Sequence, residues 1–149
     1  MNHELSEDLL TAWLRLSTSI IGSRIVSELS YKESLVCNLL YRNSLKQDGK
    51  PLTATDLCIQ TNMLKSQMNR ILNALEEKQV ITRKRSPEDG RRVLITMNPL
   101  QSQAYYRQHQ HILDIMNTMI LRLGEEEAFN AVRLLNRISD IAHHMQLGQ

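Results

Sequence analysis

A run of polar side chains between positions 65 and 73 has the hydrogen-bonding chemistry needed to contact the edges of nucleic-acid bases. Its members are Lys65, Ser66, Gln67, Asn69, Arg70 and Asn73. Gln and Asn pair with N6 and N7 of adenine, and Arg pairs with O6 and N7 of guanine, each good pair discriminating by about 1–3 kcal/mol. A solvated helix face carries the same residue types and is the alternative. We expect Lys65 and Asn73 to lie nearer to the sugar-phosphate backbone and the other four to contact bases.

Positive charge is concentrated in the middle of the chain. The 149 residues carry a formal net charge of +2, yet residues 29–98 hold twelve Lys or Arg against seven Asp or Glu. Five of these cations surround a predicted turn: Arg83, Lys84, Arg85, Arg91 and Arg92. Clustered cations suit a polyanion, and we expect all of them except Arg91 to neutralise phosphates and make binding salt-dependent. A solvated hairpin is the alternative, in which Arg85 and Arg92 pair with Glu88.

The polar run lies on a predicted helix over residues 63–78 whose opposite face is apolar. Leu64, Met68, Ile71, Leu72 and Leu75 recur there at helical spacing. A shorter helix is predicted to begin at Thr53, which forms a capping box with Asp56, and its residues 57–59 are expected to face inward. Two short helices joined by about three residues, the second with a polar face, indicate a helix-turn-helix.

After this helix the apolar period changes from 3.6 to 2. Residues 80–85 and 92–97 are predicted to form two strands, and the turn residues of 86–91 reverse the chain between them. The result is a β-hairpin with a basic tip. Asp89 lies two residues before Arg91, and we expect its carboxylate to hold the Arg91 guanidinium.

Long amphipathic helices flank this basic unit. One contains Leu5, Leu9, Trp13, Leu16 and Ile20 and ends at Gly22 or near Glu28. Another is capped by Ser30 and Glu33 and runs to about residue 46. A third begins at Pro99 after an Asn98 cap, buries Leu100 and ends at Gly124, and a last one follows from residue 125.

The outer helices are too long to bury their apolar stripes against a unit of about 70 residues, so they must pack on one another or on a second copy of the chain. We therefore expect a homodimer that presents two recognition helices about 34 Å apart, one turn of DNA. A monomer with an internal helical bundle is the alternative.

Other function classes find little support. No run of about 20 apolar residues occurs, and residues 1–10 carry acidic rather than basic side chains, so we expect a cytoplasmic protein with no membrane contact. Cys37 and Cys58 have no CxxC spacing, and the five histidines do not gather, so neither a metal site nor a cofactor is expected. The sequence contains no nucleophile elbow, no P-loop and no HExxH motif of a zinc protease, which argues against an enzyme.

Three stretches, in their order and spacing, resemble the MarR (multiple antibiotic resistance regulator) family of winged helix-turn-helix regulators. They are residues 70–83 (RILNALEEKQVITR), residues 89–95 (DGRRVLI) and residues 52–57 (LTATDL). The chain departs from the family pattern at Gln79, where Gly is usual because the position favours φ > 0. It departs again at Asn98 and Pro99, in place of the usual Leu-Thr-x-x-Gly junction.

The resemblance implies a mainly α fold with a small β wing. A winged helix-turn-helix lobe is expected over residues 30–98, and residues 1–29 with 99–149 are expected to form one discontinuous helical dimerisation region. It further implies a homodimeric repressor that binds a pseudo-palindromic operator in double-stranded DNA, with the wing residue Arg91 in the minor groove.

The resemblance also implies a small-molecule effector bound between the two regions. The expected pocket residues are Trp13, Ser17, Arg24, Tyr31, Tyr105 and His109. Two alternatives remain open: a metal- or thiol-responsive regulator of the same fold, and a module that binds a protein partner instead of DNA.

Overall fold

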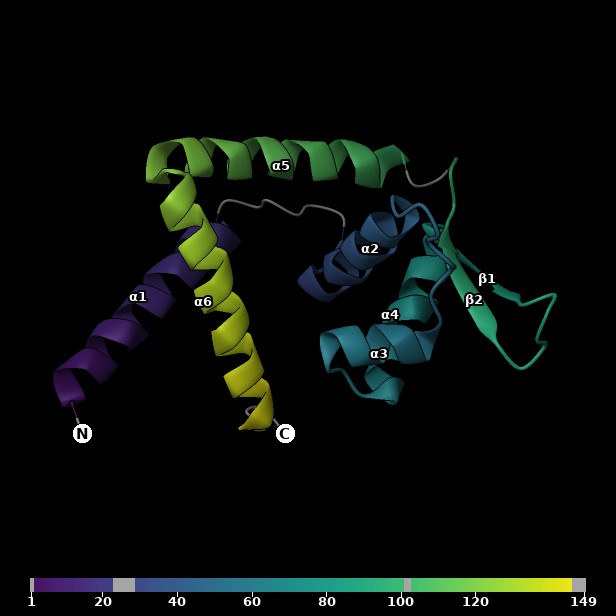
Figure 1. The fold of residues 1–149 in the computed structure, drawn as a ribbon, viewed down its shortest axis with the longest axis horizontal. Coiled ribbons are helices and arrows are strands. Elements are labelled where there is room, and N and C mark those ends of the chain that lie inside the picture. The colour runs from purple at the N-terminus through teal and green to yellow at the C-terminus, as the bar shows by residue number, and fades with distance from the viewer. Residues whose placement is uncertain (1, 23–28, 101–102, 146–149) are drawn as a thin grey trace.

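Three helices and a two-stranded sheet form a lobe at one end of the protein, and a long helix leads from this lobe to the last helix at the other end (Figure 1). The computed structural model describes residues 2–22, 29–100 and 103–145. Within them the elements are α1 (His3–Gly22), α2 (Tyr31–Ser44), α3 (Ala54–Thr61), α4 (Lys65–Glu77), β1 (Ile81–Arg85), β2 (Val93–Met97), α5 (Gln103–Leu123) and α6 (Glu125–His144). This order and composition confirm the predicted fold class, mainly α with a small β wing.

The core of the lobe lies beneath α4. Met68, Leu72 and Leu75 are fully buried there, and Ile71 is almost so, as their helical spacing predicted. Two predictions of burial on α3 and α4 are wrong. Leu64 is 65% exposed because it is the N-cap residue of α4, outside the helical repeat, and Ile59 on α3 is 71% exposed.

Capping boxes begin the first two helices of the lobe, as predicted. The Ser30 hydroxyl accepts a bond from the Glu33 N–H of α2 (3.2 Å), and the Glu33 carboxylate accepts one from the Ser30 N–H (3.3 Å). At α3 the Thr53 hydroxyl accepts from the Asp56 N–H (3.2 Å), and the Asp56 carboxylate accepts from the Thr53 N–H (2.9 Å). Reciprocal bonds of this kind satisfy backbone donors that a helix leaves without partners, and so set its first residue.

The chain leaves α4 through a residue with left-handed backbone geometry. Gln79 has φ of 62°, in the region that the usual glycine would adopt without strain, which confirms the conformation expected there. The turn places Val80 in the core and starts the hairpin, in which Arg83 lies opposite Ile95 and Arg85 opposite Val93. Both strands begin or end within one residue of their predicted bounds.

The outer helices expose much of their apolar surface within a single chain. On α6 no residue is buried, and Phe129, Leu135 and Ile141 are each at least half exposed. On α1, Leu9 is 60% and Trp13 52% exposed. None of the helices in the described part of the chain is long and apolar enough to cross a bilayer.

The predicted start of the long helix at Pro99 is wrong. Asn98 does accept a bond from the Leu100 N–H (3.2 Å), but residues 99 and 100 form a turn, and the described part of α5 begins at Gln103. Leu100 is 79% exposed, because it precedes the helix and does not share its apolar face.

Candidate nucleic-acid interface

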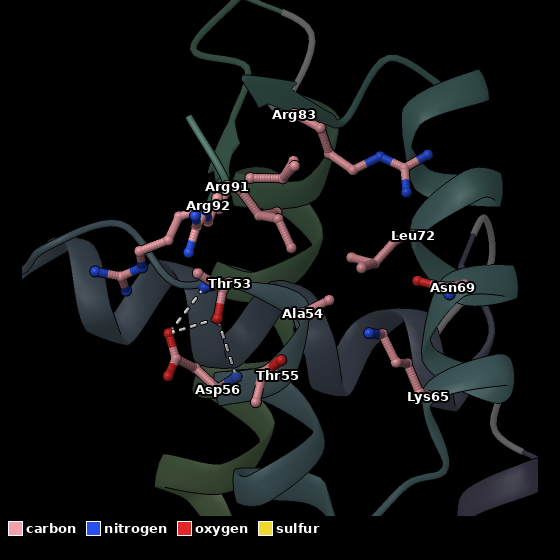
Figure 2. Close-up of a pocket in the computed structure, with 12 residues that line it drawn as sticks. Thr53, Ala54, Thr55, Asp56, Lys65, Asn69, Leu72, Arg83, Arg91 and Arg92 are labelled. Carbon is pink, nitrogen blue, oxygen red and sulfur yellow. Dashed lines mark hydrogen bonds between the residues drawn. The ribbon is translucent and has the colours of Figure 1, made fainter. Parts of the chain in front are cut away.

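A cleft of about 530 Å³ lies between the N-terminal ends of α3 and α4 and the wing, which is the β1–β2 hairpin (Figure 2). Lys65 and Asn69 of α4 line one side, and Arg91 and Arg92 of the wing line another. The floor includes the buried side chains of Leu72 and Ile95. Cations therefore reach this cleft from two separate elements, which the core of the lobe holds together.

The N-terminus of α3 contributes polar atoms that the sequence indicated only as a cap. Thr53, Thr55 and Asp56 all line the cleft, and the Asp56 carboxylate accepts bonds from both the N–H and the hydroxyl of Thr53, each 2.9 Å long. This carboxylate is thus held by its own cap and lies beside the cations.

The predicted DNA-contacting residues lie on the outward side of α4. Lys65, Ser66, Asn69 and Arg70 are exposed, and Gln67 is half-buried. Because α4 packs its opposite side into the core, these side chains are presented together on one rigid helix. Their contact with bases remains a prediction.

Hydrogen bonds within the turn hold the tip of the wing. The Ser86 hydroxyl accepts from the N–H groups of Glu88 and Asp89 (both 3.3 Å), and Arg85 Nη1 donates to the Gly90 carbonyl (2.9 Å). The Asp89 carboxylate accepts from the backbone N–H of Arg91 (3.0 Å). The contact predicted for Asp89 was with the guanidinium, so the carboxylate shapes the turn, and the exposed Arg91 side chain extends from it.

One predicted phosphate contact, Arg83, is engaged with the recognition helix α4. Arg83 Nε donates to Glu76 Oε2 (3.0 Å), and its Nη2 donates to Glu76 Oε1 (3.2 Å) and to Asn73 Oδ1 (2.5 Å). The hydrogen bond from Arg83 holds the pKa of Glu76 below its ordinary value. Figure 2 shows the Arg83 side chain extending toward the helix that carries Asn69. The sequence did not indicate Glu76 as a partner.

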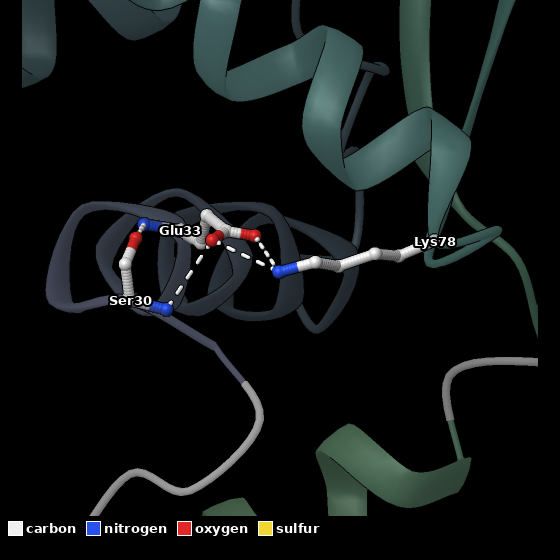
Figure 3. Close-up of polar contacts among 3 residues, drawn as sticks. All are labelled: Ser30, Glu33 and Lys78. Atoms are coloured by element: carbon white, nitrogen blue, oxygen red, sulfur yellow. Dashed lines mark hydrogen bonds and ion pairs between the residues drawn. The ribbon is translucent and has the colours of Figure 1, made fainter.

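A second ion pair joins the far end of α4 to the start of α2 (Figure 3). Lys78 Nζ lies 2.7 Å from Glu33 Oε2 and 3.1 Å from Oε1. Burial by itself raises the pKa of Glu33, but the bonds from Lys78 and Ser30 outweigh it and hold the pKa below its ordinary value. The Glu33 carboxylate therefore caps α2 and fixes the C-terminal end of α4 at the same time.

A separate apolar groove of about 370 Å³ lies between α2 and α5. Three of the predicted effector residues, Tyr31, Tyr105 and His109, line it. Trp13 and Ser17 lie on α1, outside the lining, and Arg24 lies outside the described residues.

Polar groups in this groove come from both helices, with Ser34 and Asn38 on α2 and Tyr105, Gln108 and His109 on α5. The Tyr105 hydroxyl lies 3.3 Å from His109 Nδ1, and the two rings stack. Burial lowers the pKa of His109, which favours its neutral form. Within the described residues Gln108 Nε2 is a buried donor with no hydrogen-bond partner, and sequence reasoning missed it.

The thiol of Cys37 is not activated. Cys37 is fully buried, and burial, followed by the nearby Glu33 charge, raises its pKa to about 12, so little thiolate forms at neutral pH. Among the residues that the structure describes, no three His, Cys, Asp or Glu side chains gather as a metal site would require.

Comparison with known proteins identifies a family and a fold. The family described as "Transcriptional regulator SarA/Rot" matches residues 23–107, more than half of the chain. No curated protein sequence matches.

Solved structures share the overall fold. The transcription regulator MarR from Oenococcus oeni aligns with a TM-score of 0.68 at 18% identity, over 88% of this chain and 98% of that one. The PcaV transcriptional regulator from Streptomyces coelicolor, in complex with its natural ligand, gives 0.68 at 19% identity, over 89% and 91%. A probable transcriptional regulator from Pseudomonas aeruginosa gives 0.63 at 20% identity, over 87% and 93%. These matches confirm the winged helix-turn-helix fold predicted from the resemblance to MarR.

Proposed function

This chain belongs to the SarA/Rot family of transcriptional regulators, and we propose that it acts as a homodimeric repressor that binds double-stranded DNA sequence-specifically. The observation that carries this proposal is the basic cleft between α4 and the wing. Lys65 and Asn69 from the helix, together with Arg91 and Arg92 from the wing, combine hydrogen-bonding groups with cations on one surface. An α-helix fits the major groove of DNA, and arginine suits the narrow minor groove beside it.

In this proposal the two elements have different tasks. The exposed side of α4, with Gln67, Asn69 and Arg70, reads base edges and supplies the choice of sequence. The wing cations Lys84 and Arg92 neutralise phosphates and supply affinity without sequence choice, while Arg91 enters the minor groove.

The outer helices support the dimer. The side chains of α1 and α6 expose large apolar areas, which a monomeric protein rarely does, and a second copy would bury them. Two-fold symmetry then repeats α4 on one side of the dimer, so a pseudo-palindromic operator matches it.

The groove between α2 and α5 supports a small-molecule effector that relieves repression. Its volume of about 370 Å³ is in the range of ligand pockets, and its lining is apolar with a few polar groups. Neutral His109 and the buried amide nitrogen of Gln108 can orient a ligand that carries a hydrogen-bond acceptor. The PcaV structure is a complex with that protein's natural ligand, so a protein of this fold can bind one.

Fluorescence anisotropy with duplexes from the region upstream of the protein's own gene tests the proposal. We expect tight binding to one pseudo-palindrome, a steep fall in affinity with salt, and weak binding to a shuffled duplex. Arg91→Ala should weaken binding because the wing loses its minor-groove contact, and Gln67→Ala should reduce sequence discrimination. Arg122→Ala, which removes a cation from the far end of α5, is the matched control and should change neither.

Light scattering must show that each variant remains a dimer. Binding that is indifferent to sequence or to salt would contradict the proposal. Normal DNA binding by a protein lacking both Arg91 and Gln67 would do the same, and would favour a module that binds a protein partner.

A further inference from the structure

Arg83, Glu76 and Asn73 form a small network, here called the Arg83 cluster, that joins the wing to the recognition helix. All three hydrogen bonds originate on one guanidinium: two go to the Glu76 carboxylate and one to the Asn73 amide oxygen. Arg83 belongs to β1 and the other two residues to α4, so the cluster connects the two elements that line the basic cleft. The Arg83 side chain is 24% exposed and that of Glu76 45% exposed.

The charges in this cluster argue against a phosphate contact by Arg83. The carboxylate of Glu76 lies against both Nε and Nη2, so the pair has no net charge. A phosphate that approached Arg83 would also approach Glu76 and be repelled by it. Arg83 also lines the cleft, but its guanidinium points toward α4, whereas Arg91 and Arg92 line the cleft from the other side (Figure 2).

The cluster also determines which atoms of Asn73 face outward. A guanidinium carries only N–H donors, so the amide must turn its oxygen toward Arg83. The Asn73 side chain is exposed, and its Nδ2 therefore remains as a donor toward the solvent side. A bidentate contact with adenine needs the amide oxygen and the amide nitrogen to face the base together, and here the oxygen is directed toward Arg83.

We propose that Arg83 is a positioning residue: bonded to Glu76 and Asn73, it sets the wing against α4 and restricts Asn73 to donating a hydrogen bond to a backbone phosphate. This inference rests on the proposed function, because it assigns roles within the DNA-binding surface. It divides the wing cations into Arg91 and Arg92, which contact DNA, and Arg83, which does not.

The salt dependence of binding separates the two roles. The probe is a duplex that the wild-type protein enriches from a random pool, and affinities are measured at salt concentrations from about 50 to about 200 mM. A phosphate contact by Arg83 predicts that Arg83→Gln lowers the salt slope by about 0.9. A positioning role predicts an unchanged slope and an affinity reduced by up to about fivefold, the worth of an exposed ion pair.

Two further variants sharpen the test. Glu76→Gln removes a negative charge from the DNA-binding side, so it should raise affinity if Arg83 contacts phosphate, whereas the positioning role predicts lower affinity. Arg83→Lys keeps the charge but loses the planar fork, and it should fail to restore binding. Lys84→Gln, a change at the next residue of β1, is the matched control, and it should lower the slope because Lys84 is expected to neutralise a phosphate.

The variant Asn73→Ala tests the role assigned to Asn73. Its affinity is measured for the enriched duplex and for single-base variants of that duplex. A phosphate contact predicts an equal loss of affinity on every duplex, and a changed base preference would overturn this assignment. Thermal unfolding confirms that each variant is folded.

The outcomes for the function and for the inference are distinct. If wild-type protein enriches no duplex, the proposed function fails and this inference fails with it. If wild-type protein binds and Arg83→Gln lowers the slope, or Glu76→Gln raises affinity, only the positioning role is overturned.

Discussion

Replacing Lys78 by Met removes the cation that joins the end of α4 to the start of α2, and we expect the lobe to be destabilised. The methionine retains most of the aliphatic stem, so the change deletes charge and hydrogen bonds with little loss of packing. Glu33 would then keep its bond from Ser30 but lose both bonds from Lys78.

The size of this effect follows from the exposure of the two partners. The Glu33 side chain is only 11% exposed, whereas that of Lys78 is 43% exposed. Removing one partner of a fully buried pair costs about 3–5 kcal/mol, and an exposed pair contributes at most about 1 kcal/mol. Because this pair is intermediate, we expect a loss of about 1–2 kcal/mol in the free energy of unfolding at about pH 7.

The same loss must depend on pH. Burial by itself raises the pKa of Glu33, and the bonds from Lys78 and Ser30 bring it below its ordinary value in the folded protein. A carboxyl group with a lowered folded-state pKa contributes stability that is fully present above the unfolded value of about 4.3. That contribution is lost as the pH falls through the folded-state pKa. The difference between wild type and Lys78→Met should therefore be constant from about pH 7 to about pH 5.5 and shrink below about pH 4.

Urea unfolding at one fixed protein concentration measures this difference, because the stability of the proposed dimer depends on concentration. Glu33→Gln, alone and combined with Lys78→Met, completes a double-mutant cycle and isolates the energy of the pair. Additive losses, or a loss that stays the same from about pH 7 to about pH 3, would refute the reasoning.

Three other outcomes are expected. Ile138→Glu places a charge on the apolar side of α6 and should convert the proposed dimer to monomers in light scattering. Asn136→Glu places the same charge on the opposite side of the helix and should leave the dimer intact. If both variants remain dimers, α6 does not form the interface. Gln79→Gly should raise the free energy of unfolding by about 0.5–1 kcal/mol, because glycine adopts the observed φ of 62° without strain. A lower free energy of unfolding would argue against a left-handed backbone at Gln79. Iodoacetamide at about pH 8 should label the partly buried Cys58 before Cys37, because burial raises the pKa of Cys37 to about 12. Mass spectrometry measures the two labelling rates, and equal rates would contradict the burial of Cys37.

Local signals in the amino-acid sequence were sufficient to define the elements of this protein. Helical spacing identified the buried face of α4, and two capping boxes located the starts of α2 and α3. The change of period at residue 80 revealed the wing. These signals are readable because each depends on residues within a few positions of one another. Where the local signal was ambiguous, as at Leu100 beside the Asn98 cap, the predicted helix start was wrong.

The meeting of distant side chains, in contrast, follows from the packing of the folded chain. Glu33 and Lys78 are 45 positions apart, and their contact depends on how α2 packs against α4. The Arg83 cluster likewise depends on the angle between the wing and α4, and the groove that unites Tyr31 with Tyr105 requires α5 to return alongside α2. Spacing along a chain specifies which side of a helix a residue occupies, but the angle and offset at which two elements pack arise from the whole core. That packing turns Arg83 toward Glu76 and leaves Arg91 exposed, although both were equally basic residues of the same hairpin in the sequence.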